Sequence, residues 1–314
     1  MKKVLISTTS FGKYDGSPLE LLKQAGLEPV MNPYGRTLKR EEVLDLASEA
    51  SGIIAGTEPL DGMVLESLKG LKVISRCGAG LDNVDMRAAN RYGISVYSTP
   101  YGPTPAVAEL TVALALDLMR RITEMDRDIR SGKWRKVMGS LLSGKKLGII
   151  GFGRIGRKVA ALLLPFGVEI SYYDLRCSTP AIGCRQVELS ELLSWADIIT
   201  IHVSPASPVK TVLGSMEIGL LKQGSCLINT SRGGVVDESA LYEALKSGRI
   251  SGAALDVFEE EPYTGSLREF PNVILTPHIG SYAREARAEM ELESVNNLLA
   301  GLGVAELAKM SSNY

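Results

Sequence analysis

Cysteine and histidine are scarce in this chain of 314 residues, which has four cysteines and two histidines. The cysteines show none of the paired spacing that zinc sites use, at Cys77, Cys177, Cys184 and Cys226. A chain of this length can bury two sizeable cores without disulfide bonds. We therefore expect neither a metal site nor a disulfide framework, and only two side chains that titrate near neutral pH, His202 and His278.

Long apolar runs and an excess of charge of one sign are also absent. The 35 basic and 36 acidic residues give a formal net charge of -1, so charge gives no general reason to expect nucleic acid or an anionic membrane as a partner. No uninterrupted apolar segment is long enough to span a bilayer, and the run after Met1 is too short for a signal peptide. We expect a cytoplasmic protein.

Short β-rich runs alternate with helical patterns along almost the whole chain, which is typical of parallel sheets covered by helices. A first series of runs comprises residues 4–7, 52–55, 73–76 and 95–98, with helices such as 18–24 and 40–49 between them. A second series comprises residues 146–150, 169–174, 198–202, 226–230, 253–257 and 273–275. The pattern predicts an α/β protein with two doubly wound parallel-sheet domains.

One long helical pattern, residues 105–129, separates the two series. We interpret it as a single helix that connects the two domains. Prolines at positions 100, 103 and 105 interrupt the chain just before it, which favours a hinge at residues 98–104.

The segment 146–174 predicts a dinucleotide pocket. An apolar run leads into a glycine motif, Gly151-Phe152-Gly153-Arg154-Ile155-Gly156. Such a motif needs glycine for the sharp turn, for close approach of a pyrophosphate and for packing of the following helix on the sheet. The N-terminal end of that helix would hold the phosphates.

An acid, Asp174, follows the motif by eighteen residues. Its carboxylate can accept hydrogen bonds from both hydroxyls of an adenosine ribose and would repel a 2'-phosphate, which favours NAD over NADP. Arg176 lies close enough in the sequence to weaken that preference.

Three kinds of side chain are candidates for chemistry at the same sheet edge. His278 follows the last run, and the alternative for it, as for His202, is a hydrogen-bonded structural histidine. Arg232 precedes two glycines and suits a substrate carboxylate, although a surface arginine is common in such a loop. The acids 259–261 are typical of a solvated turn, and spacing alone does not choose among them.

Six segments together resemble the D-isomer-specific 2-hydroxyacid dehydrogenase family over nearly the whole chain. They are residues 76–85 (RCGAGLDNVD), 107–110 (VAEL), 151–156 (GFGRIG), 231–237 (SRGGVVD), 254–262 (ALDVFEEEP) and 276–280 (TPHIG). The resemblance implies a catalytic trio of Arg232, Glu261 and His278, in which His278 takes the proton of the substrate hydroxyl.

The resemblance also implies the remaining site residues. Asp256 would contact the nicotinamide, and backbone amides around Gly78 to Gly80 would hold the substrate carboxylate. Further cofactor contacts are implied at Ala79, Val203, Thr230, Arg232, His278, Gly280 and Ser281, and further substrate contacts at Arg76 and Cys77.

The family's architecture implies a flavodoxin-like substrate domain formed by residues 1–99 and 283–314. It implies a Rossmann NAD-binding domain of residues 100–282 that includes the connecting helix. The active site is expected in the cleft between the domains. The connecting helix is expected to form a homodimer, or to take part in a tetramer.

Residues 133–139 and 142–145 are similar to D-3-phosphoglycerate dehydrogenases, for which Arg76, Arg135 and Lys136 would bind the phosphorylated substrate. Surface charge on an interface loop is the alternative for the latter two. The chain stops at Tyr314, so we expect no C-terminal regulatory domain. Two other functions are compatible with the resemblance: a reductase of glyoxylate, hydroxypyruvate or another 2-ketoacid, and an NAD-sensing corepressor.

Overall fold

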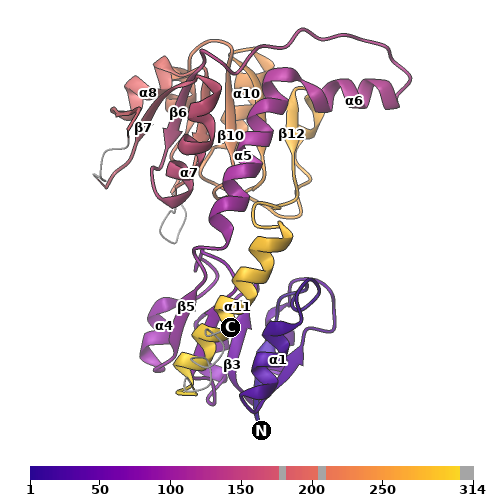
Figure 1. The fold of residues 1–314 in the computed structure, drawn as a ribbon, viewed down its shortest axis with the longest axis vertical. Coiled ribbons are helices and arrows are strands. Elements are labelled where there is room, and N and C mark those ends of the chain that lie inside the picture. The colour runs from indigo at the N-terminus through magenta and orange to yellow at the C-terminus, as the bar shows by residue number, and fades with distance from the viewer. Residues whose placement is uncertain (177–181, 204–209, 305–314) are drawn as a thin grey trace. The chain divides into compact units, whose positions relative to one another are not determined.

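The computed structural model of the chain describes residues 1–176, 182–203 and 210–304 (Figure 1). Two compact units are present. The first contains residues 1–103 together with residues from 281 onward, and the second contains residues 104–280. Each unit is an α/β structure with its own parallel sheet, as the sequence predicts.

The sheet of the first unit has five parallel strands in the order β2-β1-β3-β4-β5, the flavodoxin-like order. The strands are β1 (Lys2–Ile6), β2 (Leu27–Met31), β3 (Ala50–Ala55), β4 (Val73–Arg76) and β5 (Ser95–Ser98). The sequence pattern does not reveal β2, because Pro29 lies in it. Proline is tolerated there since β2 is an edge strand.

Five helices cover this sheet: α1 (Ser17–Gln24), α2 (Arg40–Leu46), α3 (Gly62–Ser67), α4 (Met86–Arg91) and α11 (Arg284–Gly301). The C-terminal helix α11 packs on β3, β4 and β5, where Val295 and Leu298 join the buried cluster that contains Val4 and Ile54 (Figure 1). Helix α11 therefore completes the core of the first unit.

The sheet of the second unit has seven parallel strands in the order β12-β11-β10-β9-β6-β7-β8, which is the Rossmann order with one further strand at an edge. The strands are β6 (Lys146–Ile150), β7 (Glu169–Tyr173), β8 (Cys184–Gln186), β9 (Ile198–Ile201), β10 (Ser225–Asn229), β11 (Ile250–Leu255) and β12 (Val273–Leu275). The sequence does not reveal β8, a three-residue edge strand that is mostly exposed.

The helices of this unit are α5 (Pro103–Arg120, which starts at the boundary), α6 (Ile122–Arg130), α7 (Arg154–Leu163), α8 (Leu189–Trp195), α9 (Ser215–Leu220) and α10 (Glu238–Lys246). Short 3-10 helices span Leu164–Phe166 and Ser266–Glu269. In α10 the side chain of Asp237 caps the amide of Ala240, and Gly248 has a positive φ of 72° beyond the last turn. None of the helices in the described part of the chain is long and apolar enough to cross a membrane.

The prediction of one continuous helix over residues 105–129 is wrong. The helix starts earlier, at Pro103, where proline fits the first turn, and it breaks at Arg121, whose φ is 55°. Asp117 stabilises the break, because its carboxylate accepts hydrogen bonds from the amide and the hydroxyl of Thr123. Periodicity does not reveal such a break, since α6 continues the amphipathic pattern.

Candidate functional site

The glycine motif forms a tight turn between β6 and α7. Gly151 has a φ of 89°, and a Cβ there would lie 2.6 Å from the carbonyl oxygen of His202. A Cβ on Gly156 would lie 2.2 Å from the carbonyl oxygen of Gly151, so only glycine permits this packing of helix on turn. A Cβ on Gly153 would meet no atom within 4 Å, which leaves open space at the start of α7. The turn fits a pyrophosphate against the helix N-terminus.

Asp174 stands at the end of β7, next to this turn. Its Oδ2 accepts a hydrogen bond from the amide of Phe152 at 2.6 Å, and its Oδ1 accepts one from the amide of Arg176 at 2.8 Å. These two bonds fix the carboxylate beside the glycine turn. Both oxygens retain lone pairs for further donors, as a ribose would require.

His278 and Glu261 form a pair after the carboxyl ends of β12 and β11. The Nδ1 of His278 lies 2.9 Å from Oε2 of Glu261, and the amide of Phe258 donates to Oε1 of Glu261 at 3.2 Å. Burial acts to raise the pKa of Glu261, but the hydrogen bond and charge of His278 and the amide of Phe258 hold that pKa below its usual value. An ionised Glu261 would therefore accept a hydrogen bond from the Nδ1–H group of the imidazole. This bond keeps the proton on Nδ1 and leaves Nε2 available to a substrate.

The backbone around His278 is held by Asp256, which follows β11. Asp256 is buried and accepts hydrogen bonds from the Thr276 hydroxyl and from the amides of Ile279 and Gly280, at 2.6, 2.8 and 2.8 Å. His278 lies between these anchors with a φ of 54°, a conformation that side chains with a Cβ seldom adopt. Burial raises the pKa of Asp256 despite these hydrogen bonds.

Arg232 lies in the turn that follows β10. Asn229 shapes this turn, because its Nδ2 donates to the carbonyl of Arg232 at 3.0 Å and its Oδ1 accepts from the amide and hydroxyl of Ser231. A Cβ on Gly233 would lie 1.7 Å from the carbonyl oxygen of Phe258. Glycine at this position therefore allows the turn that carries Arg232 to pack closely against the backbone at Phe258. The positive charge of Arg232 is near enough to act on Glu261. Sequence reasoning missed Asn229, whose only signal is an amide at the end of a buried strand.

His202, the second histidine, is buried at the end of β9. Its Nε2 lies 2.8 Å from the hydroxyl of Thr200. Burial lowers the pKa of His202 to about 3, so the side chain is neutral near pH 7. The structural alternative fits His202, whereas His278 lies exposed at the sheet edge with its acid partner.

The segment 76–80 belongs to the first unit. The amide of Gly78 donates to Oγ1 of the buried Thr99 at 2.7 Å, a contact that sequence reasoning did not anticipate. The Cys77 thiol is buried, which raises its pKa to about 11. Ala79 is exposed, and the guanidinium of Arg76 donates to the carbonyl of Cys77.

The other expected site residues are distributed as follows. Val203 is half-buried after β9, and Thr230 is buried, with its hydroxyl 3.1 Å from that of Thr111. Ser281 is the first residue of the C-terminal part of the first unit. Arg135 binds acids of its own chain: its Nε lies 2.7 Å from Asp128 and its Nη2 lies 2.7 Å from the buried Glu124. Lys136 is exposed.

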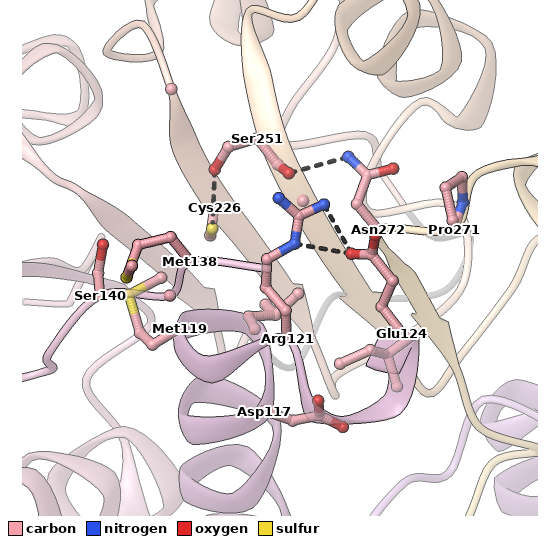
Figure 2. A pocket seen from close by; sticks show the side chains of 15 residues that line it. Asp117, Met119, Arg121, Glu124, Met138, Ser140, Cys226, Ser251, Pro271 and Asn272 are labelled. Carbon is pink, nitrogen blue, oxygen red and sulfur yellow. Dashed lines mark hydrogen bonds and ion pairs between the residues drawn. The ribbon is translucent and has the colours of Figure 1, made fainter. Parts of the chain in front are cut away.

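A cavity of about 270 Å³ lies elsewhere, at the amino ends of β10, β11 and β12. Figure 2 shows side chains that line it, among them Cys226, Ser251, Asn272 and the Arg121–Glu124 ion pair. The candidate catalytic residues follow the carboxyl ends of the same strands, so this cavity is at the opposite edge of the sheet. Within the described ranges, no cluster of three or more possible metal ligands occurs.

Comparisons with known proteins show which family the chain resembles. A model of the NAD binding domain of D-isomer specific 2-hydroxyacid dehydrogenases matches residues 112–280. A glyoxylate reductase of Thermococcus litoralis is 41% identical over 286 residues, which are 87% of this chain and 85% of that protein. A D-3-phosphoglycerate dehydrogenase of Archaeoglobus fulgidus is 35% identical over 94% of this chain, but the match spans only 57% of that longer protein.

The fold is shared as well. The crystal structure of the TT0316 protein from Thermus thermophilus has a TM-score of 0.87 and 38% identity, and the match covers 96% of this chain and 97% of that one. The matched domain is one that binds NAD, and the open glycine turn with Asp174 beside it fits this cofactor. The chain belongs to the D-isomer specific 2-hydroxyacid dehydrogenase family.

Proposed function

We propose that this protein oxidises a D-2-hydroxy acid to a 2-keto acid, or catalyses the reverse reaction, with Arg232, Glu261 and His278 as its catalytic residues. NAD, when bound, accepts the hydride from C2 of the substrate. The observation that carries the proposal is the 2.9 Å contact between His278 and Glu261 at the sheet edge where the glycine turn also lies.

His278 is the proton acceptor in this proposal. As the C2 hydroxyl becomes a carbonyl it must lose its proton, and Nε2 of His278 takes it while Nδ1 stays bonded to Glu261. The carboxylate of Glu261 then stabilises the imidazolium that forms. Arg232 binds the substrate carboxylate and, in the direction of reduction, stabilises the negative charge that develops on the carbonyl oxygen.

D-3-phosphoglycerate is the substrate that we propose first. The match to a D-3-phosphoglycerate dehydrogenase over 94% of this chain supports it, and so do the basic side chains of Arg76, Arg135 and Lys136.

A second candidate, reduction of glyoxylate or hydroxypyruvate, is favoured by a specific observation. Arg135 binds both Glu124 and Asp128, so much of its charge is neutralised within its own chain. The glyoxylate reductase match, which spans 85% of that relative, supports the same candidate.

We also propose that the protein is a homodimer. Several large apolar side chains are exposed on α6 and the segment after it, at Ile122, Ile129, Trp134, Met138 and Leu141. Burial of these side chains against a second copy would remove apolar surface from water.

Steady-state assays distinguish these functions. NADH oxidation is measured with 3-phosphohydroxypyruvate, hydroxypyruvate and glyoxylate under identical conditions. We expect the highest kcat/KM with the phosphorylated substrate, and a higher value with either of the others supports the second candidate. If none of the three is turned over, the proposed enzyme function is contradicted and the corepressor alternative is favoured.

A further inference from the structure

A glutamate of the first unit is buried at the sheet edge where substrates of such folds bind. Glu58 follows the carboxyl end of β3 and is 1% exposed. Its Oε1 accepts a hydrogen bond from the hydroxyl of Ser7, just after β1, at 2.5 Å and another from the amide of Gly56 at 3.2 Å. Isolated charges are seldom buried this deeply without a reason.

The second oxygen of this carboxyl group lies in a gap left by glycine. Oε2 of Glu58 is buried and has no hydrogen-bond partner within residues 1–176, 182–203 and 210–304. A Cβ on Gly56 would lie 3.0 Å from this oxygen, so a larger residue at position 56 would crowd it. Asn83 holds the same turn, since its Nδ2 donates to the carbonyl of Glu58 at 2.7 Å.

Arg76 at the end of β4 lies opposite Ala55 at the end of β3, three residues before Glu58. Burial raises the pKa of Glu58, and the hydrogen bond from Ser7 and the positive charge of Arg76 oppose this shift. The same guanidinium lies over Gly78, where a Cβ would come within 2.3 Å of Nη1. Arg76 is therefore close both to the turn that carries Glu58 and to the glycine segment 78–80.

We propose that Glu58 is a specificity-determining residue, which offsets the charge of Arg76 and so weakens the preference of this site for a phosphorylated over an unphosphorylated 2-hydroxy acid. This inference rests on the proposed function.

The consequence can be measured with two substrates that differ only by a phosphate group. D-3-phosphoglycerate carries a dianionic phosphate above pH ~7, whereas D-glycerate has a neutral hydroxyl group in its place. Glu58→Gln removes the buried charge and keeps the shape of the side chain and an acceptor for Ser7. Both substrates carry a carboxylate, but only D-3-phosphoglycerate has a second anionic group, whose binding should improve when the charge of Glu58 is removed. The ratio of the two kcat/KM values therefore reports on the charge at position 58.

The experiment measures NAD reduction with both substrates at pH 9, where a buried carboxyl group is ionised even if its pKa is raised by several units. We expect Glu58→Gln to raise the ratio of kcat/KM for D-3-phosphoglycerate to that for D-glycerate at least tenfold. Two unit charges about 10 Å apart in a medium with an effective dielectric constant of about 20 already interact by a little more than this factor, and the phosphate carries two charges. Glu66→Gln, the same replacement on the exposed face of α3, should leave the ratio within about twofold.

Several outcomes would overturn the inference. A structural role for Glu58 would lower both kcat/KM values together and leave their ratio unchanged. Glu58→Asp retains the charge and should retain the wild-type ratio even if its rates fall. If Glu58→Gln does not fold, Arg76→Gln tests the charge that Glu58 is proposed to offset. In this variant the ratio of kcat/KM for D-3-phosphoglycerate to that for D-glycerate should fall at least tenfold. An unchanged ratio refutes the role of Arg76 and with it the role proposed for Glu58. If the wild-type protein oxidises neither substrate and reduces none of the keto acids, the proposed function itself fails.

Discussion

The buried histidine should make the second unit sensitive to acid. His202 has a pKa of about 3 in the folded protein, against about 6.5 in an unfolded chain. Between these values the unfolded state binds a proton that the folded state does not, so stability is complete above pH ~6.5 and is lost as the pH falls towards 3. At 1.36 kcal/mol per pH unit, lowering the pH from 7 to 4.5 should cost about 2.5 kcal/mol through this residue alone.

His202→Gln isolates the effect, because it removes the titrating group and leaves all other acids in place. Urea unfolding is followed by tryptophan fluorescence at pH 7 and pH 4.5. Both tryptophans, Trp134 and Trp195, belong to the second unit, so the signal reports on that unit. The free energy of unfolding of the variant, relative to the wild type, should increase by about 2.5 kcal/mol on acidification. A relative stability that does not change with pH would show that His202 is not held neutral by burial.

Two further predictions concern the candidate site. His278→Gln should lower kcat by roughly 10² to 10⁴ while NADH binding, measured by fluorescence titration, is retained, because the imidazole acts on the substrate proton; wild-type turnover in this variant would refute its role, and His202→Gln serves as the matched control. Gly156→Ala should weaken NADH binding at least tenfold in the same titration or prevent folding, since its Cβ would lie 2.2 Å from the carbonyl of Gly151; unchanged binding with an unchanged melting temperature would contradict this interpretation of the turn.

The two parallel sheets could be predicted because their central strands are buried on both faces and appear as continuous apolar runs. β6 and β10 are examples, with Leu147 and Leu227 fully buried. The edge strands β2 and β8 were missed for the opposite reason. Exposure on one side lets them accept Pro29 and polar residues, so they have no run to detect.

Some residues of the candidate site can be recognised in the sequence and others cannot. Residues with a fixed steric requirement, such as Gly151 and Gly156, can be recognised in the sequence, because nothing larger fits. Residues whose role depends only on where they lie in the fold cannot be recognised in this way. Glu58 and Thr99 belong to common residue types, and their burial at a sheet edge depends on tertiary packing. For Arg135, the ion pairs with Glu124 and Asp128 of α6 depend on the path of the chain after this helix, which periodicity does not reveal.

The left-handed backbone at His278 has a consequence for protein engineering. A residue with a Cβ costs about 1 kcal/mol in this conformation relative to glycine, so stability alone would favour glycine at position 278. Selection for thermostability without an activity screen would therefore favour loss of the imidazole. The strained backbone at His278 lowers the stability of the fold but orients the imidazole. The hydrogen bonds from the amides of Ile279 and Gly280 to Asp256 hold this backbone in the strained conformation.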